Sequence, residues 1–81
     1  MYSSPFLQSI YDFMLVRQYS KRTIETYLIW IKSYINYHNK KHPKVMGPRE
    51  VTDFLSYLAC ERHVSPSTQN TALNSLAFLN S

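Results

Sequence analysis

The stretch SKRTIETYLIWIKSYINYH, residues 20–38, decides the fold. At about 100° per residue its apolar side chains gather on one half of a helical wheel, which predicts a helix from the cap Ser20 to about Asn39. The half expected in the core holds Ile24, Tyr27, Leu28, Ile31, Tyr34, Ile35 and His38, with Trp30 and Tyr37 at its edge. The polar half holds Lys21, Arg22, Glu25, Thr26, Ile29, Lys32, Ser33 and Asn36.

Three further helices are predicted around this one, each beginning at a capping residue followed by proline. They run from Ser4-Pro5 to about Tyr19, from Gly47-Pro48 to near His63, and from Ser65-Pro66 to the end of the chain, with residues 40–46 as a loop. No stretch alternates as a half-buried strand does, so the expected fold is all-α, a compact four-helix bundle. The residues expected to face inward are Phe6, Leu7, Ile10, Phe13, Met14, Val51, Phe54, Leu55, Leu58, Ala72, Leu73, Leu76, Ala77 and Leu79.

Length and composition indicate one globular domain and exclude several classes of protein. The chain has 81 residues, a single glycine and a single cysteine. One glycine excludes Gly-rich phosphate loops, and the N-terminus lacks the features of a signal peptide. No apolar run reaches the ~18 residues that a membrane span needs. One cysteine excludes an internal disulfide and favours the reducing cytoplasm.

The positive charge is concentrated in one segment. Residues 17–44 carry seven cationic side chains against Glu25, although the net charge of the whole chain is only +4. Such a segment is typical of binding to nucleic acid, an anionic surface or an acidic partner. Ile29 lies within the polar half of the second helix, where an aliphatic side chain can contact a thymine methyl group.

The fourth helix carries a second polar arc, which is uncharged. Ser67, Asn70, Thr71, Asn74 and Ser75 share it, and no charged residue occurs from position 64 to position 81. Short uncharged donors and acceptors suit base edges and phosphates. A face turned toward a protein partner explains the same composition equally well.

The spacing of histidine and cysteine residues in the sequence predicts no catalytic or metal site. His38, His42 and His63 are too scattered for a helical metal pair, and Cys60 has no neighbouring cysteine. His38 is expected to be a core-edge histidine and Cys60 an exposed thiol. We therefore expect no cofactor and no small-molecule substrate, and an autonomous enzyme is the least supported interpretation.

Two segments resemble a known family. SKRTIETY at 20–27 and SPSTQNTALNSLAFL at 65–79 resemble the second and fourth helices of the SAM-like N-terminal, core-binding domain of tyrosine recombinases. YLIWIK at 27–32, KKHP at 40–43 and Met46-Gly47 resemble integron integrases in particular. The resemblance covers nearly the whole chain.

The resemblance implies that residues 1–81 are one N-terminal DNA-binding domain, half of a clamp around duplex DNA. The catalytic domain, with its nucleophilic tyrosine, is expected to follow and is absent from this chain. The helical pattern still running at residues 78–81 favours such a continuation. We expect DNA recombination sites and other recombinase protomers as partners, no membrane, and a place in the bacterial cytoplasm at the nucleoid. The expected DNA-binding residues are Lys21, Arg22, Lys32, Asn36, Lys40, Lys41, Lys44, Ser67, Asn70 and Asn74.

One alternative from another class is a helical protein-interaction module. It would use the Trp30 and Tyr37 edge or the uncharged face of the fourth helix. Tyr11, Leu15 and Val16 lie outside the core arc of the first helix, where a neighbouring protomer or another part of the same chain would cover them.

Overall fold

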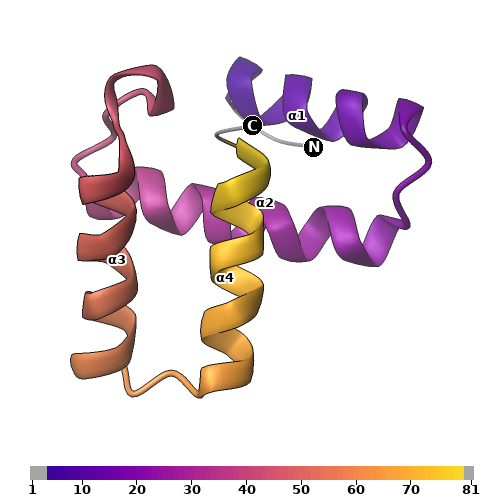
Figure 1. Cartoon of the computed structure of the whole chain (residues 1–81). Helices are drawn as coiled ribbons and strands as arrows, with labels where there is room; N and C mark the ends of the chain where they lie inside the picture. Colours follow the sequence, from indigo (N-terminus) through magenta and orange to yellow (C-terminus); the bar gives the residue numbers. More distant parts are fainter. Residues whose placement is uncertain (1–3, 80–81) are drawn as a thin grey trace.

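The computed structural model describes residues 4–79 and consists of four α-helices joined by short turns (Figure 1). The all-α prediction is confirmed, and within the described part of the chain no strand occurs. Asn80 and Ser81, on which part of the predicted fourth helix falls, lie outside the described residues. The elements are α1 (Pro5–Val16), α2 (Lys21–Tyr37), a one-turn 3₁₀ helix η1 (Pro43–Val45), α3 (Pro48–Cys60) and α4 (Pro66–Leu79).

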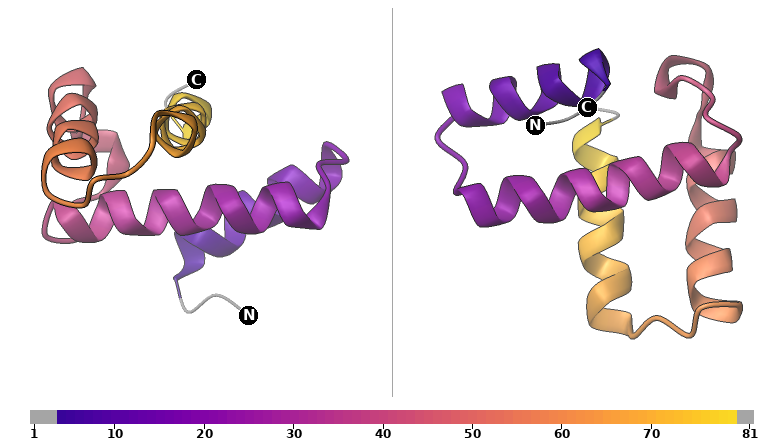
Figure 2. Two further views of the ribbon diagram at one scale, coloured as in Figure 1. Left: turned by 90° about the horizontal axis from the view of Figure 1, so that it is seen from below. Right: turned by 180° about the vertical axis from the view of Figure 1, so that it is seen from behind.

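The other helices are arranged around α2. Figures 1 and 2 show α3 and α4 antiparallel to each other on one side of α2, with α1 antiparallel to α2 along an adjoining side. The helix α4 crosses α2, so that its N-terminal half extends beyond α2 (Figure 1). The predicted bundle therefore has α2 as its common packing element.

The buried face of α2 contributes to both parts of the core. Ile24, Leu28 and Ile31 pack with Leu7, Ile10 and Met14 of α1. One turn further on, Tyr34 packs with Met46, Phe54, Leu58, Ala72 and Leu76. The hydroxyl of Tyr34 is enclosed without a hydrogen-bond partner among the described residues, and burial raises the pKa of this phenol. The predicted inward half of α2 is thus confirmed.

Left-handed residues end the first three helices earlier than the periodic pattern predicts. Gln18 has φ 65°, Asn39 and Lys40 have φ 59° and 63°, and His63 has φ 52°. A residue in this conformation directs the chain out of the helix, which is a common way for helices to stop. Consequently α1 ends at Val16, α2 at Tyr37 and α3 at Cys60, two to three residues before the predicted ends.

Hydroxyl caps open two of the helices as predicted. The N–H of Thr23 donates to Ser20 Oγ at 3.2 Å, and the N–H of Thr68 donates to Ser65 Oγ at 3.3 Å. Ser4 occupies the same position before α1, but its side chain makes no cap hydrogen bond. At the start of α3, Glu50 caps instead, because its Oε1 accepts the N–H of Gly47 at 2.6 Å.

The predicted register of α4 is partly wrong. Leu73 is 43% exposed and Ala77 is exposed, whereas Ser75, predicted on the polar arc, is fully buried. The Ser75 hydroxyl donates to the carbonyl of Thr71 at 2.9 Å, so this small polar group is satisfied within its own helix and fits the core. Leu73 instead lines an apolar groove against Leu55 and Val64.

One aromatic residue of α1 also departs from the predicted core. Phe13 is 47% exposed, with the guanidinium of Arg17 4.5 Å from its ring centroid. Its ring also meets that of Phe78 in α4 edge to face, at 6.0 Å between centroids. Phe13 therefore covers the end of α4 rather than filling the interior.

Two leucine truncations test this packing. Leu28 is 2% exposed, so Leu28→Ala should lower the free energy of unfolding by about 2–5 kcal/mol through the cavity it leaves. Leu73→Ala removes the same atoms from an exposed position and should cost no more than about 0.5 kcal/mol. Urea unfolding of both variants measures the difference, and equal losses would contradict the register of α4.

Three serine-to-alanine variants test the helix caps. Ser20→Ala and Ser65→Ala each remove a hydroxyl that accepts a first-turn N–H, and each should cost about 0.5–2 kcal/mol. Ser4→Ala is the matched control, because its hydroxyl caps nothing and its loss should leave stability nearly unchanged. Thermal unfolding is the measurement; a control as damaging as the other two would show that the cap bonds contribute no stability.

Candidate nucleic-acid interface

The exposed half of α2 carries one stripe that faces the α3 side of the molecule. Arg22, Ile29 and Ser33 follow one another by seven and four residues, so they share one line along the helix. Ile29 is 62% exposed, and it lines a groove with Ser33, Arg62 and Val64 where α3 ends. Arg22 is exposed at the N-terminal end of this stripe.

A second stripe of α2 faces α1. Lys21, Lys32 and Asn36 follow one another by eleven and four residues, and all three are exposed. Lys32 and Asn36 line a cavity against Phe6 and Leu7 of α1. The structure therefore spreads the polar half of α2, which the sequence presents as one surface, over two directions, and Asn36 also lines the groove of Ile29 and Ser33.

The polar arc of α4 is smaller than predicted. Ser67, Asn70 and Asn74 are exposed, but the Thr71 hydroxyl donates to the carbonyl of Ser67 at 3.3 Å and Ser75 is buried. Asn70 lies one turn before Asn74 on the same face of α4, at the edge of the apolar groove shared with α3. Two of the five predicted arc residues, Thr71 and Ser75, thus use their hydroxyls in hydrogen bonds to the backbone of α4 itself.

Aromatic packing fixes which flank of α4 faces the start of α2. The ring of Phe78 lies 5.9 Å from that of Tyr19 and 6.0 Å from that of Tyr27, between centroids. Asn74 and Ser67 precede Phe78 by four and eleven residues, so they share its flank. The helices cross there, with the N-terminal half of α4 projecting past α2 (Figures 1 and 2). We call the angle between them, with Arg22, Ser67 and Asn74, the α2–α4 corner.

Three more of the predicted cations lie around one cavity at the opposite end of α2. Lys32 and Asn36 share a cavity of ≈ 350 Å³ with Lys40, Lys41 and His42 of the following loop. We call this cavity the lysine pocket. No carboxylate occurs among the described residues that line it, and its apolar walls are Phe6, Leu7, Ile35 and Pro43.

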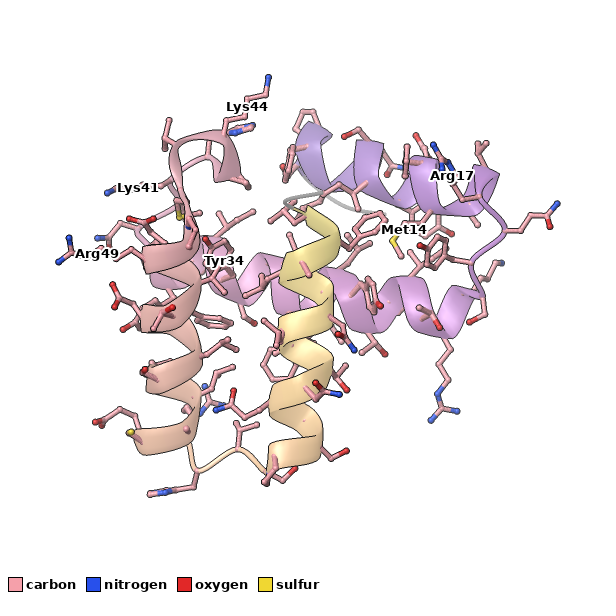
Figure 3. All side chains as sticks on the ribbon, viewed as in Figure 1. Met14, Arg17, Tyr34, Lys41, Lys44 and Arg49 are labelled. Carbon is pink, nitrogen blue, oxygen red and sulfur yellow. The ribbon has the colours of Figure 1, made fainter. Side chains whose placement is uncertain are left out.

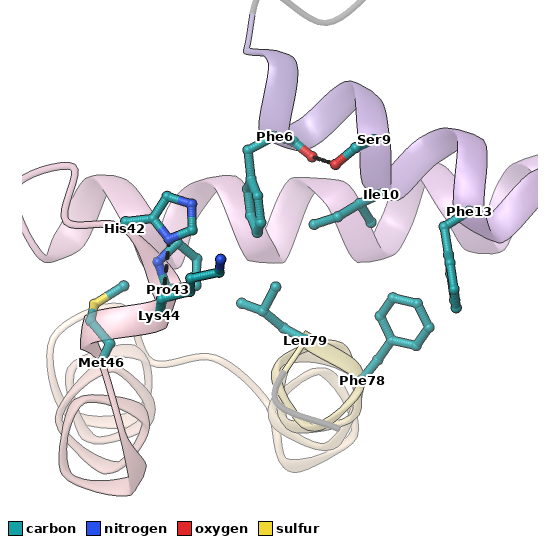
Figure 4. A pocket seen from close by; sticks show the side chains of 10 residues that line it. All are labelled: Phe6, Ser9, Ile10, Phe13, His42, Pro43, Lys44, Met46, Phe78 and Leu79. Atoms are coloured by element: carbon teal, nitrogen blue, oxygen red, sulfur yellow. Dashed lines mark hydrogen bonds between the residues drawn. The ribbon is translucent and has the colours of Figure 1, made fainter.

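Two of the cations predicted to bind DNA lie outside both the α2–α4 corner and the lysine pocket. Lys44 lines a neighbouring cavity between the loop, α1 and the end of α4 (Figure 4). Lys21 is exposed at the first position of α2 and lines neither cavity. In Figure 3, Lys41 and Lys44 lie at the loop end of the molecule and Arg17 at the far end of α1.

Nearly the whole chain matches one known protein family. Residues 6–81 match the phage integrase N-terminal SAM-like domain. The chain belongs to this family. The matched region is the N-terminal part of such integrases, not their catalytic part, and the SAM-like fold agrees with the four helices described here.

Two similar proteins are described as integrase/recombinase, one from Escherichia coli and one from Pseudomonas aeruginosa. Each is 47% identical over 60 residues, which is 74% of this chain and 18% of the relative. The aligned part of the SAM-like domain thus spans less than a fifth of the length of these relatives. Together with the family match, they identify a recombinase N-terminal domain.

Sequence reasoning missed the structural role of His42 in the SAM-like domain. Its Nδ1 accepts the N–H of Lys44 at 3.1 Å, which caps η1, and its ring meets Phe6 edge-on at 4.9 Å (Figure 4). The only local signal was a polar residue before Pro43, the usual cap position before a helical proline. The contact with Phe6 spans 36 positions and has no sequence signal.

The other titratable candidates have structural explanations. His38 Nε2 lies 2.9 Å from the carbonyl oxygen of Glu50, which confirms it as a satisfied core-edge histidine, and Cys60 is exposed as expected. Within residues 4–79 no three His, Cys, Asp or Glu side chains come together as a metal site would require. No helix in the same range is both long enough and apolar enough to span a bilayer.

The cap that opens α3 lowers the pKa of Glu50. The hydrogen bond from Gly47 N–H, and then the N–H of Glu50 itself, hold its pKa below the usual range, and His38 and Lys41 act in the same direction. A carboxylate whose pKa falls on folding stabilises the protein above its unfolded pKa. That contribution is lost as the pH falls through the folded-state value.

A Glu50→Gln variant tests this assignment. Glutamine keeps an acceptor for Gly47 but cannot ionise, so the variant should be less stable than the parent near neutral pH. The difference should shrink once the pH falls below the ordinary glutamate pKa of about 4.3. Urea titrations on both sides of that pH measure it, and a gap independent of pH would exclude an ionised cap.

Proposed function

We propose that this SAM-like domain binds double-stranded DNA as the N-terminal half of the clamp of a site-specific tyrosine recombinase. The observation that carries the proposal is the α2–α4 corner, where two helices that cross each carry exposed polar side chains (Figure 1). Arg22 extends from α2, and Ser67 and Asn74 come from the uncharged flank of α4. The family match and the integrase/recombinase relatives support it.

The two sets of residues have different roles in this proposal. The cations Lys21, Arg22 and Lys32 neutralise phosphates, which supplies most of the affinity and carries no sequence information. The amides and hydroxyls of α4 reach into the major groove of the DNA, whose width of about 12 Å admits a helix. Asn74 reads a base edge, Ser67 contacts a base edge or a phosphate, and Ile29 contacts a thymine methyl group. Asn36, Asn70, Lys40, Lys41 and Lys44 complete the proposed DNA-binding set.

The proposal extends to the whole recombinase. A catalytic domain outside this chain would cut and rejoin DNA, while the SAM-like domain positions the duplex without a cofactor. We place the protein among integron-type integrases, on the strength of YLIWIK at 27–32 and KKHP at 40–43, and in the bacterial cytoplasm at the nucleoid. Other protomers on the same DNA are its protein partners, and Leu15 and Val16, both exposed on α1, are available to them.

A second candidate function is a helical protein-interaction module. The apolar groove of Leu55, Ala59, Val64 and Leu73 favours it, because Leu73 is exposed there. The salt dependence of binding separates the two functions, since only contacts with phosphates release condensed counterions from DNA.

Alanine variants of two cations test the DNA-binding proposal. The 81-residue chain should bind duplex DNA weakly, with log K falling against log salt by roughly 0.9 for each phosphate contact. Arg22→Ala and Lys32→Ala should weaken binding to every sequence and each reduce that slope by about one contact. Arg49→Ala, an exposed arginine at the start of α3, is the control and should change neither quantity. Fluorescence anisotropy over a range of salt measures both.

The companion variant Asn74→Ala separates base reading from charge. In the full-length recombinase it should cost about 1–3 kcal/mol on the preferred site and less on random duplex, leaving the salt slope unchanged. Equal losses on both DNAs would make Asn74 a backbone contact. Unchanged affinity in Arg22→Ala and Lys32→Ala, with the fold intact, would refute the DNA-facing assignment of α2.

A further inference from the structure

We propose that the outer face of α3 is a docking surface for an arginine-bearing segment of a protein partner. The site goes beyond DNA binding, since α3 carries none of the residues assigned to DNA. Its centre is a cavity of ≈ 620 Å³ between the end of α2 and α3, which we call the tyrosine cavity. The residues that line it are Tyr37, His38, Asp53, Ser56, Tyr57, Cys60 and Glu61.

The tyrosine cavity lies on the side of α3 that faces away from α4. At about 100° per residue, Asp53, Ser56 and Cys60 fall within about 60° of one another on the helical wheel. Leu55 and Ala59 fall on the opposite side of the wheel, and they line the apolar groove that α3 shares with α4. The two faces of α3 are therefore separate surfaces.

Two tyrosine rings form a rigid aromatic wall of the cavity. The rings of Tyr37 and Tyr57 lie 4.6 Å apart between centroids, tilted by 32°. The buried ring of Phe54 stacks under that of Tyr57 at 6.4 Å, and His38 meets Tyr37 edge-on at 4.9 Å. Tyr37 is nevertheless 40% exposed, so part of its ring is open to a ligand. A wall fixed in advance loses little conformational entropy on binding.

The electrostatic potential of the cavity is negative from three sources. Asp53 and Glu61 are exposed two turns apart, and among residues 4–79 neither has an ion-pair partner. Glu61 directly follows α3, whose last turn carries no basic residue, so the negative end of the helix dipole adds to the carboxylates. The faces of the tyrosine rings are the third source. Arg62, the nearest cation in the sequence, lines the groove of Ile29 instead.

This combination fits a guanidinium group better than any other ligand. A guanidinium is planar, so it stacks on an aromatic face, and its N–H groups donate in pairs to a carboxylate. An ammonium group is a point charge and matches the aromatic wall less well. The carboxylates repel phosphates, so nucleic acid is excluded as the occupant.

The arginines of this chain do not fit as the occupant, so a second copy is not the partner that we propose. Arg17 already lies over an aromatic ring of α1, 4.5 Å from its centroid, and Arg22 is assigned to DNA. Arg49 lies in the first turn of α3 and Arg62 directly after its C-cap. Insertion of either from a second copy would bring two acidic α3 faces together. The partner is therefore a basic segment of another protein.

A blocked peptide of four arginines tests the tyrosine cavity directly. We expect ¹H–¹⁵N spectra of the 81-residue chain to show saturable shifts confined to α3 and the end of α2. Bound peptide should also slow the alkylation of Cys60 by iodoacetamide, because this thiol is exposed and lines the cavity. A peptide of four citrullines, which lacks the charge, should do neither. No saturable shifts, or shifts centred on other helices, would overturn the site.

Exchange of arginine for lysine tests the choice of ligand. A peptide of four lysines has the same charge but cannot stack or donate in pairs, so it should bind about threefold more weakly or worse. Equal affinity for the two peptides would overturn the assignment to a guanidinium group.

Matched variants test the two kinds of wall. Asp53→Asn/Glu61→Gln should weaken binding of the arginine peptide by about tenfold or more, whereas Glu25→Gln, an exposed carboxylate on α2 outside the cavity, should change it less than about twofold. Tyr37→Leu should weaken it by about threefold, and Tyr37→Phe, which keeps the ring, should not. All of these positions are exposed, so thermal unfolding should show that each variant remains folded. Equal losses in Glu25→Gln and the double variant would reduce the effect to net charge and overturn the site.

Sedimentation of the chain without peptide tests the identity of the occupant. We expect no self-association that depends on Asp53 and Glu61. Self-association of the parent chain that Asp53→Asn/Glu61→Gln abolishes would overturn the proposed partner and make a second copy the occupant.

Discussion

The whole structure depends on the burial of one face of α2. That face packs with α1 through Ile24, Leu28 and Ile31 and with α3 and α4 through Tyr34, so one helix carries both parts of the core. A small domain has little other apolar surface to bury, which makes this shared face the main source of cooperativity. The opposite face of α2 is left exposed by the same arrangement. Under the proposed function, stability and DNA binding therefore use the two sides of a single helix.

Sequence periodicity predicted the fold where apolar and polar residues separate cleanly. On α2 the two halves are distinct, and the predicted core half from Ile24 to His38 is the half that packs inward. On α4 they are not, because Leu73 and Ser75 lie only two positions apart and either could complete an inward stripe. The structure buries the serine, since its hydroxyl is satisfied by Thr71 and its small volume fits. Hydrophobicity alone does not predict that Ser75 is buried and Leu73 exposed.

The residue types of the candidate site could be predicted from the sequence, but which of these residues the fold brings together could not. The charge count identified the basic segment, and the wheel identified the exposed side of Lys32 and Asn36. What divides the surface is the position of α1, since Phe6 and Leu7 form the far wall of the lysine pocket. Those contacts join residues about 30 positions apart in the sequence. The local sequence pattern carries no information about contacts of this range. The same holds for the aromatic packing of Phe78 that orients α4, because it too joins residues far apart in the sequence.

The geometry of the α2–α4 corner depends on two small buried residues of α4. Ala72 and Ser75 are fully buried, and side-chain size at a helix contact sets how closely two axes approach, usually 8–10 Å. The distance between the two helices that form the corner is therefore controlled from inside the core. A larger residue at either position would act as a wedge and open the corner, although every side chain on its surface stayed the same. Under the proposed function, relatives with identical surface residues would differ in this way in the shape of duplex they accept.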